Sequence, residues 1–394
     1  MDSDLGLRLR EIREWRSLGL RACAELSGIS YGYLAKIERG EKPVNSRKLL
    51  EALANTLRVS PNELLGKPYA PTDAESGGIH SALPVIEDVL TGWWVGEIPQ
   101  AQGRPWPVVQ ADLHRLEREL RPKADYAAQA EMLPGLIRDL LALVGSGEHR
   151  RAALLGLLSA YKTAAYLTHD LGRSGLPTLA VERMRQTAEE LGDPHHLADV
   201  SWRRAQLLSG SNRRRQYELA SGVAGTTGTP EHMRGMAHLT AALASAVLGD
   251  EGVALDHLNE ATALADATET DGRPYRPSDF CGSNVGIWRV TVGVELGYGA
   301  KVAEIAESVR PSEVAPHRQA VFWADLGRGL LSDRKSRAQG LAALLRAERL
   351  APQKTRANPF IRETVSSMLT AARRDAAGRE LRGLAWRMGV APAG

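Results

Sequence analysis

Residues 20–40, LRACAELSGISYGYLAKIERG, constrain the fold of this chain more than any other segment, because they predict two short helices that meet at a tight corner. Gly28 lies where the chain turns, and glycine adopts a positive φ without the steric cost of a Cβ. Ser30 is a favourable N-cap for the second helix, since its hydroxyl accepts a hydrogen bond from a free backbone amide. Leu34 and Ile37, three residues apart, then face inward. We therefore expect a helix-turn-helix, whose second helix enters the major groove of DNA.

Several residues of this segment stand where repressors of the XRE (Cro-type) family carry their motif. They are Ala24, Gly28, Ile29, Ser30, Leu34, Ile37, Glu38 and Gly40. The sequence resembles that family over roughly residues 5–66. The resemblance implies a five-helix DNA-binding domain over residues 1–66, with residues 30–38 as the recognition helix. The chain departs from the family at Gly19 and Leu20, where Ser or Thr followed by Gln is usual, so a helix cap and a common phosphate-contacting amide are missing there.

The first helix is expected over residues 4–17, where the apolar residues at helical spacing are Leu5, Leu9, Ile12 and then Trp15 or Arg16. The resemblance implies that Arg13 pairs with Glu38 and ties this helix to the recognition helix. Two independent surface charges are the alternative. Ser46 or Asn45 is expected to cap a fourth helix, and Ser60 to cap a fifth that ends at Gly66.

Net charge alone does not point to nucleic acid, because the formal total is only +3. The local distribution of charge does point to nucleic acid, because basic residues outnumber acidic ones from the end of the predicted recognition helix onward. Those between positions 36 and 48 are Lys36, Arg39, Lys42, Arg47 and Lys48, against Glu38 and Glu41. A solvated charged face is the alternative interpretation. The coincidence of this strip with the predicted motif favours DNA as the partner.

Residues at the places of Tyr31, Gly32 and Lys36 reach base edges in the family that the sequence resembles. Lys36 is suited to donate to O6 and N7 of guanine, and Tyr31 to pack on a thymine methyl or to bind a phosphate. Gly32 either leaves a base unread or allows a close backbone approach. The side chains better placed for phosphates are those of Tyr33, Arg39, Lys42 and Arg47, although packing is an equal alternative for Tyr33. The predicted DNA-binding residues are Ser30, Tyr31, Gly32, Tyr33, Lys36, Arg39, Lys42 and Arg47.

Composition limits the remaining possibilities. A chain of 394 residues is too long for one ordinary core, so we expect two or more domains. The only cysteines, Cys23 and Cys281, form no CxxC or Cys/His cluster, so neither a disulfide framework nor a zinc site is expected. The N-terminus has no apolar signal region, and no run of 18 apolar residues occurs. We expect a cytoplasmic protein without a membrane partner or a cofactor.

A linker is expected over residues 67–82, which are rich in Pro, Gly, Ser and Ala. From residue 83 to residue 394 the pattern is almost entirely helical, with pairs of amphipathic stretches separated by Gly, Ser, Asp or Pro. Helix pairs that repeat every 35–45 residues or so are typical of a helical solenoid. The expected fold is therefore all-α, with a tetratricopeptide (TPR)-like solenoid of about five or six irregular hairpins after the N-terminal domain.

Two hairpins resemble the TPR pattern residue by residue. The residues that fit it are Trp323, Leu326, Gly327 and Leu330 in a first helix, Gly340, Leu344, Ala347 and Pro352 in a second, and Ala254, Leu258 and Ala261 in an earlier second helix. Segments 279–297, 358–369 and 381–390 resemble long bacterial regulators whose architecture is like that of the peptide-sensing RRNPP regulators. That resemblance implies a transcription factor whose repeat domain dimerises and binds an effector.

The inner surface of such a solenoid comes mainly from the first helix of each hairpin. By helical phase, the candidate effector-binding residues are Trp202, Asn284, Trp288 and Arg328. An amide such as that of Asn284 can hold a peptide backbone, and Arg328 a carboxylate. The alternative is that these residues belong to the core, as we expect for Trp323.

Enzymatic interpretations find little support. His195 and His196 are adjacent on a helix and diverge by about 100°, which makes a shared metal improbable. Residues 28–32 spell GxSxG, but a hydrolase nucleophile elbow follows a strand and here a helix precedes it. We expect no enzyme and no metal site.

The main hypothesis is a dimeric, sequence-specific transcriptional regulator on an inverted-repeat operator, controlled by a peptide, small molecule or protein. The alternative is a protein-interaction scaffold with a degenerate DNA-binding module, which Leu20 and Gly32 favour.

Overall fold

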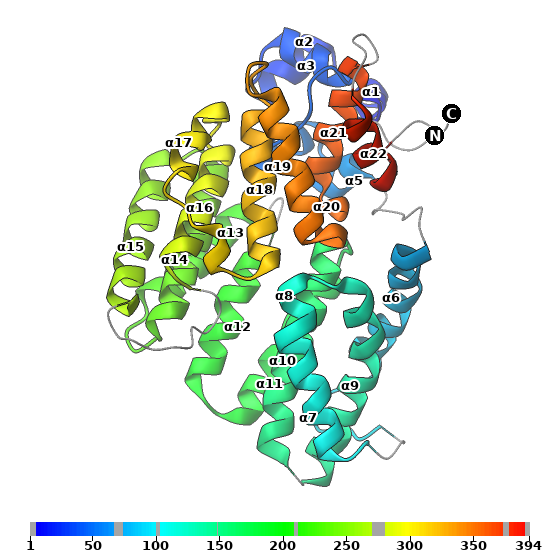
Figure 1. Cartoon of the computed structure of the whole chain (residues 1–394), viewed down its shortest axis with the longest axis vertical. Helices are drawn as coiled ribbons and strands as arrows, with labels where there is room; N and C mark the ends of the chain where they lie inside the picture. The colour runs from blue at the N-terminus through cyan, green and yellow to red at the C-terminus, as the bar shows by residue number, and fades with distance from the viewer. Residues whose placement is uncertain are drawn as a thin grey trace.

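The computed structural model describes residues 5–66, 74–99, 103–147, 149–208, 212–269, 280–372 and 378–390. These residues form helices joined by turns and loops, and none of them lies in a strand. The predicted all-α fold is confirmed. Residues 5–66 form a small bundle, the N-terminal bundle, at one end of an elongated molecule (Figure 1). The described helices between residues 74 and 390 form the helical body.

The N-terminal bundle contains the five expected helices. They are α1 (Leu5–Trp15), α2 (Leu20–Leu26), α3 (Tyr31–Glu38), α4 (Arg47–Leu57) and α5 (Pro61–Leu65). Their core includes Leu9, Leu34 and Ile37, which are fully buried. Trp15 does not extend this core, because its side chain is 76% exposed.

Local signals set the ends of these helices as expected. Ser30 caps α3 by accepting a hydrogen bond from the backbone N–H of Tyr33 at 3.2 Å. Gly28 adopts φ 68°, the conformation that the turn requires. Ser60 and Glu63 form a capping box at the start of α5. Gly19 provides no side-chain bond at the start of α2, so the departure from the family pattern leaves that end without a cap.

The helical body is built from helices that pack against their neighbours in the chain. They are α6 (Ala74–Gly92), α7 (Trp106–Arg115), a π-helix (Leu116–Leu120), α8 (Arg121–Lys123), α9 (Tyr126–Ser146), α10 (Arg150–Asp170), α11 (Leu176–Leu191), α12 (Pro194–Leu207), α13 (Arg213–Gly225), α14 (Glu231–Leu248), α15 (Glu251–Glu269), α16 (Gly282–Glu295), α17 (Val302–Ala306), α18 (Pro316–Leu330), α19 (Arg337–Leu350), α20 (Pro352–Ala357), α21 (Pro359–Ala372) and α22 (Arg379–Arg387). Part of the expected linker is helical, because α6 begins at Ala74; residues 67–73 lie outside the described residues.

The α18–α19 pair shows why small residues recur in this pattern. A Cβ added at Gly327 of α18 would lie 3.0 Å from the carbonyl oxygen of Gly340 in α19, and one added at Gly340 would lie 3.1 Å from that of Gly327. These glycines therefore let the two backbones approach closely. Leu344 is fully buried beside them. The expected packing role of the small residues is confirmed, while the TPR assignment stays a prediction.

The body curls back on itself, so that α18 and α20 meet the region around α8, α9 and α10 (Figure 1). Gln353 Oε1 accepts hydrogen bonds from the backbone N–H groups of Tyr126, at 2.5 Å, and Ala127, at 3.1 Å. Lys354 forms an ion pair with Asp170. Segments separated by roughly 200 residues thus close the inner surface of the body into a cavity.

Candidate nucleic-acid interface and central cavity

The outward face of α3 is open to solvent. Tyr31 is 53% exposed, and Gly32 and Lys36 are exposed as well. A Cβ added at Gly32 would meet no atom within 4 Å, so space beside this backbone is open. Leu34 and Ile37, on the opposite face of the helix, are fully buried. The sequence-predicted base-reading residues therefore share the accessible side of one helix.

A buried ion pair fixes α3 against α1. Arg13 donates from Nε and Nη2 to the two carboxylate oxygens of Glu38, at 2.6 and 2.9 Å. Only 10% and 7% of the two side chains are exposed. The hydrogen bond that Arg13 donates to Glu38 raises the pKa of Arg13. The predicted pair is confirmed, and its bidentate geometry orients α3 on α1.

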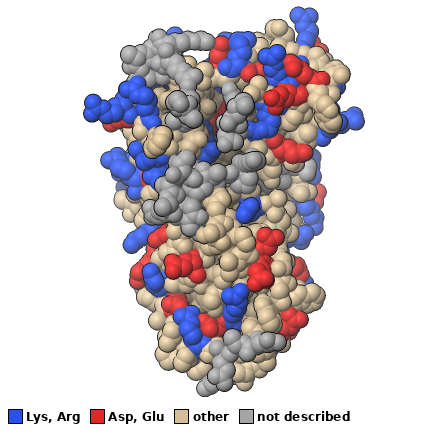
Figure 2. Space-filling view, turned by 90° about the vertical axis from the view of Figure 1, so that its right-hand side faces the viewer, with Lys and Arg blue, Asp and Glu red and all other residues tan. Residues whose placement is uncertain are grey.

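The other predicted DNA contacts of the bundle have different surroundings. Ser30 is exposed and serves as the α3 cap. Tyr33 is half-buried against the bundle core, and this burial raises its pKa. Arg39 is exposed and binds Glu41 at 3.1 and 3.2 Å. Lys42 is exposed. Ser30, Arg39 and Lys42 are therefore accessible, whereas Tyr33 contributes to packing. Figure 2 shows one side of the molecule, where the upper half carries many Lys and Arg side chains with acidic ones between them.

Arg47, predicted to contact a phosphate, lies in the contact between the bundle and the body. Its backbone N–H and its Nη1 both donate to Glu295 of α16 at 2.7 Å. The Glu295 side chain is fully buried. Arg328 of α18 adds a hydrogen bond to the carbonyl oxygen of Asn45 and lies 3.4 Å from Glu295. The start of α4 is thus held by the body through a buried ionic network.

Two further contacts extend this interface. Arg213 of α13 binds Glu51 of α4 at 2.5 Å, and both side chains are nearly buried. Phe360 of α21 packs into the core of the N-terminal bundle, with the guanidinium groups of Arg47 and Arg328 over its ring at 5.4 and 4.9 Å. The bundle is therefore docked on the body through α4, while the outward face of α3 remains open.

Sequence reasoning missed the partners that hold α4. Glu295 was not singled out, although it is the only charged residue in the mostly apolar segment VTVGVELG, residues 290–297. A carboxylate in an otherwise apolar buried helix needs a cationic partner. That need was visible in the sequence. The identity of the partner was not, because Arg47 lies far away in the chain.

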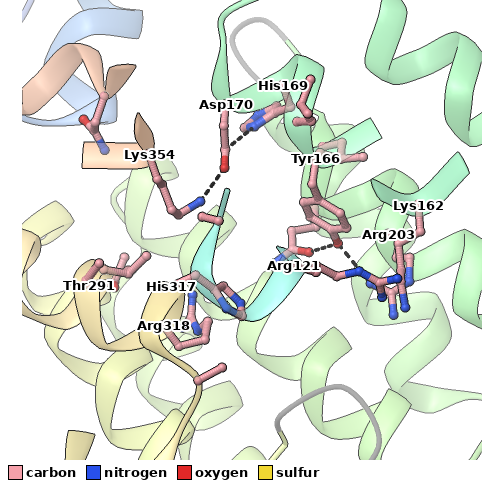
Figure 3. A pocket seen from close by; sticks show the side chains of 18 of the residues that line it. Arg121, Lys162, Tyr166, His169, Asp170, Arg203, Thr291, His317, Arg318 and Lys354 are labelled. Atoms are coloured by element: carbon pink, nitrogen blue, oxygen red, sulfur yellow. Dashed lines mark hydrogen bonds and ion pairs between the residues drawn. The ribbon is translucent and has the colours of Figure 1, made fainter. Parts of the chain in front are cut away.

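A cavity of about 640 Å³ lies inside the helical body (Figure 3). Its walls come from the π-helix, α8, α9, α10, α12, α13, α14, α16, α18, α20 and α21, and Arg47 of α4 reaches it as well. Trp202, Asn284 and Trp288, three of the predicted effector residues, line this cavity. The fourth, Arg328, lies in the contact with the N-terminal bundle instead. The structure thus brings three of the four predicted residues together around one space.

The predicted residues in the wall differ in their hydrogen bonds. Trp202 donates from Nε1 to Asp199 at 3.0 Å. Asn284 accepts from Nε of Arg318 at 2.9 Å. Trp288 Nε1 is buried and has no hydrogen-bond partner among the described residues. Of these three residues, Trp288 is the one whose side-chain donor has no partner among the described residues.

Charged groups at one side of the cavity close the body (Figure 3). Although burial alone would raise the pKa of Asp170, its contacts with Lys354 and His169 hold that pKa well below the usual range. Burial, with Lys354 and Arg318 nearby, lowers the pKa of His317 to about 3. His317 Nδ1 lies 3.2 Å from the carbonyl oxygen of Pro122. The ring is therefore neutral near pH 7.

A chain of hydrogen bonds links the cavity to the docked bundle. Thr291, in the cavity wall, donates to Asp325 at 2.7 Å. Asp325 accepts from Nη1 of Arg328 at 2.6 Å, and Arg328 binds the carbonyl oxygen of Asn45. Two hydrogen bonds thus connect Asp325, in the cavity wall, to Asn45 in the segment that precedes α4.

The described residues do not place the enzyme and metal candidates in the arrangements that those interpretations require. Within the described ranges, no three His, Cys, Asp or Glu side chains are grouped so that they could hold a metal ion. His195 and His196 lie in the first turn of α12. Residues 28–30 of the GxSxG string lie in the turn between α2 and α3, and Tyr31 and Gly32 begin α3. None of the described helices has both the length and the apolar character needed to cross a membrane.

Comparison with known families supports the N-terminal assignment. A family model described as a helix-turn-helix domain matches residues 4–65. The N-terminal bundle is a helix-turn-helix domain. No significant match was found among curated proteins or among solved structures. The family match lies within residues 4–65, so it covers the N-terminal bundle and not the helical body.

Proposed function

We propose that this protein is a sequence-specific transcriptional regulator that binds an inverted-repeat operator as a dimer. The observation that carries the proposal is the exposed face of α3 within a matched helix-turn-helix domain. Tyr31 and Lys36 lie on that face, and side chains at the start of a recognition helix reach base edges in the major groove. Two-fold symmetry of a dimer calls for two half-sites, which together form an inverted repeat.

The same proposal assigns residues 1–66 to DNA binding and residues 83–394, as a TPR-like domain, to effector binding and dimerisation. The cavity supports an effector role for the body, because Trp202, Asn284 and Trp288 line it. The bonds from Thr291 through Asp325 and Arg328 to Asn45 give an occupant of the cavity a physical route to the start of α4. An occupant that binds the docked and undocked arrangements unequally shifts their populations.

Binding-site selection tests this proposal directly. The full-length protein is incubated with fragmented genomic DNA at about 150 mM salt, where non-specific binding is weak. We expect a small set of enriched fragments that share an inverted repeat and a footprint covering both halves. Retention of genomic fragments in the same proportions as random duplexes would contradict the proposal and favour the interaction-scaffold alternative.

A further inference from the structure

Lys162 of α10 is a cation in the cavity wall with no partner in the described part of the chain. It lines the cavity and is half-buried. Its ammonium group makes neither an ion pair nor a hydrogen bond with any residue that the structure describes. Figure 3 shows its side chain beside those of Tyr166 and Arg203. An ammonium group placed this way has lost part of its hydration without gaining a direct ion pair, since Asp199 and Glu117 act on it only from beyond contact distance.

The groups around Lys162 leave a surplus of positive charge. Arg121 donates to Ser159 at 2.6 Å and lies 3.9 Å from Glu117. Arg203 binds Asp199 at 2.9 Å. Both arginines thus have a carboxylate beside them, and the charge of Lys162 is left over. Burial first, and then the charges of Arg121 and Arg203, hold the pKa of Lys162 well below its usual value. A bound anion would stabilise the charged form of Lys162 and raise its pKa.

The neighbouring wall suits the uncharged part of a small organic molecule. Trp202, Trp288, Met236 and Leu243 line the same cavity, and Nε1 of Trp288 is a buried donor without a partner in the described residues. The volume of about 640 Å³ lies within the usual range for small-molecule sites. Apolar surface with a few polar groups is the usual composition of such sites.

We propose that the central cavity binds a small organic oxyanion, a carboxylate or a phosphate ester, with its charged group against Lys162 and its apolar part against the tryptophan wall. This inference rests on the proposed function, because it gives the effector of that regulator a chemical class. Lys162 is the anchoring residue in this site. Arg121 and Arg203 shape the field around it while staying paired with Glu117 and Asp199.

Thermal unfolding of the full-length protein with simple aromatic anions tests the site. The probes are phenyl phosphate and benzoate, compared at constant ionic strength with the neutral benzyl alcohol. A ligand that binds only the folded state raises Tm in a saturable way. We expect such a rise with at least one anion and none with benzyl alcohol. The comparison of phenyl phosphate with benzoate distinguishes a phosphate ligand from a carboxylate one.

The variant Lys162→Met removes the anchoring charge and keeps the length of the side chain. Since it breaks no ion pair among the described residues, we expect it to fold and to have a Tm no lower than that of the wild type. Its affinity for the active anion should fall at least tenfold. Lys301→Met, at an exposed lysine outside the cavity, is the matched control and should bind like the wild type.

Three outcomes would overturn the inference: no saturable rise with either anion up to about 20 mM, an equal rise with benzyl alcohol, or an unchanged affinity in Lys162→Met. The assay contains no DNA, so it succeeds or fails independently of operator selection. Conversely, the selection is run without added anions. A failure of the proposed function is therefore distinguishable from a failure of this inference.

Discussion

At the residue scale, the Arg13–Glu38 pair holds α3 in place against α1. We predict that Arg13→Met destabilises the N-terminal bundle by about 3–5 kcal/mol, because it leaves the Glu38 carboxylate buried without its counter-charge. Urea unfolding measured by circular dichroism gives this difference. Arg10→Met is the matched control, since the Arg10–Glu14 pair is 57% and 53% exposed and such pairs contribute about 0–1 kcal/mol. Equal losses in the two variants would contradict this account of the buried pair.

Residues whose roles are set locally could be predicted from the sequence. Gly28, Ser30 and Ser60 act on backbone groups within a few positions, so the short-range pattern contains their roles. Glu295 and Lys162 could not be placed this way, because the role of each depends on groups brought from distant segments. For the predicted effector residues, helical phase indicated an inward direction for Trp202 and Trp288, but it did not predict that Arg328 lies against the N-terminal bundle.

At the element scale, the predicted phosphate contact of Arg47 would require this residue to leave Glu295 of α16. We predict that Glu295→Gln raises the DNA affinity of the full-length protein, because Arg47 and Arg328 lose the charge that holds α4 on the body. With Arg47 released to a phosphate, the slope of log affinity against log salt should steepen by about one unit. Fluorescence anisotropy at several salt concentrations measures both effects.

Glu304→Gln provides the control for that experiment, since Glu304 is exposed on α17. It should leave affinity and salt slope unchanged. If Glu295→Gln behaves in the same way, Arg47 stays with the body when DNA is bound, and its predicted phosphate contact is wrong. Tm values of both variants show whether a change in DNA affinity comes instead from a loss of folded protein.

The contact of α18 with α8 is also expected to respond to pH. The folded pKa of His317, about 3, lies below the unfolded value of about 6.5, so the unfolded state binds more protons between these values. Its contribution to stability is therefore complete above about pH 6.5 and is lost as the pH falls toward 3. We predict that urea-unfolding stability of His317→Asn falls less between pH 7 and pH 5 than that of the wild type. The slopes of unfolding free energy against pH should differ between the two proteins by up to about 1.4 kcal/mol per pH unit. Identical slopes would contradict the buried neutral ring.

At the scale of the whole molecule, the sequence predicted the repeated helix pairs but not how the body closes. Helix breaks such as Gly192 to Pro194 and Gly249 to Asp250 are local, and each lies between two helices as expected. Closure depends on contacts such as Gln353 with Tyr126 and Lys354 with Asp170, which join segments without any shared period. Docking of the N-terminal bundle likewise depends on distant partners of Arg47 and Glu51. The periodicity of a single sequence contains no signal for such pairings between distant segments.

The central claim is that the exposed face of α3 reads base pairs. It is tested most directly by the ratio of affinities for a selected operator duplex and a scrambled duplex, measured at about 150 mM salt for the wild type and Lys36→Ala. We predict that Lys36→Ala costs about 1–3 kcal/mol on the operator and relaxes the preference at one base pair of each half-site, while Lys301→Ala changes nothing. A ratio near one for the wild type, or the same ratio in Lys36→Ala, would contradict the claim.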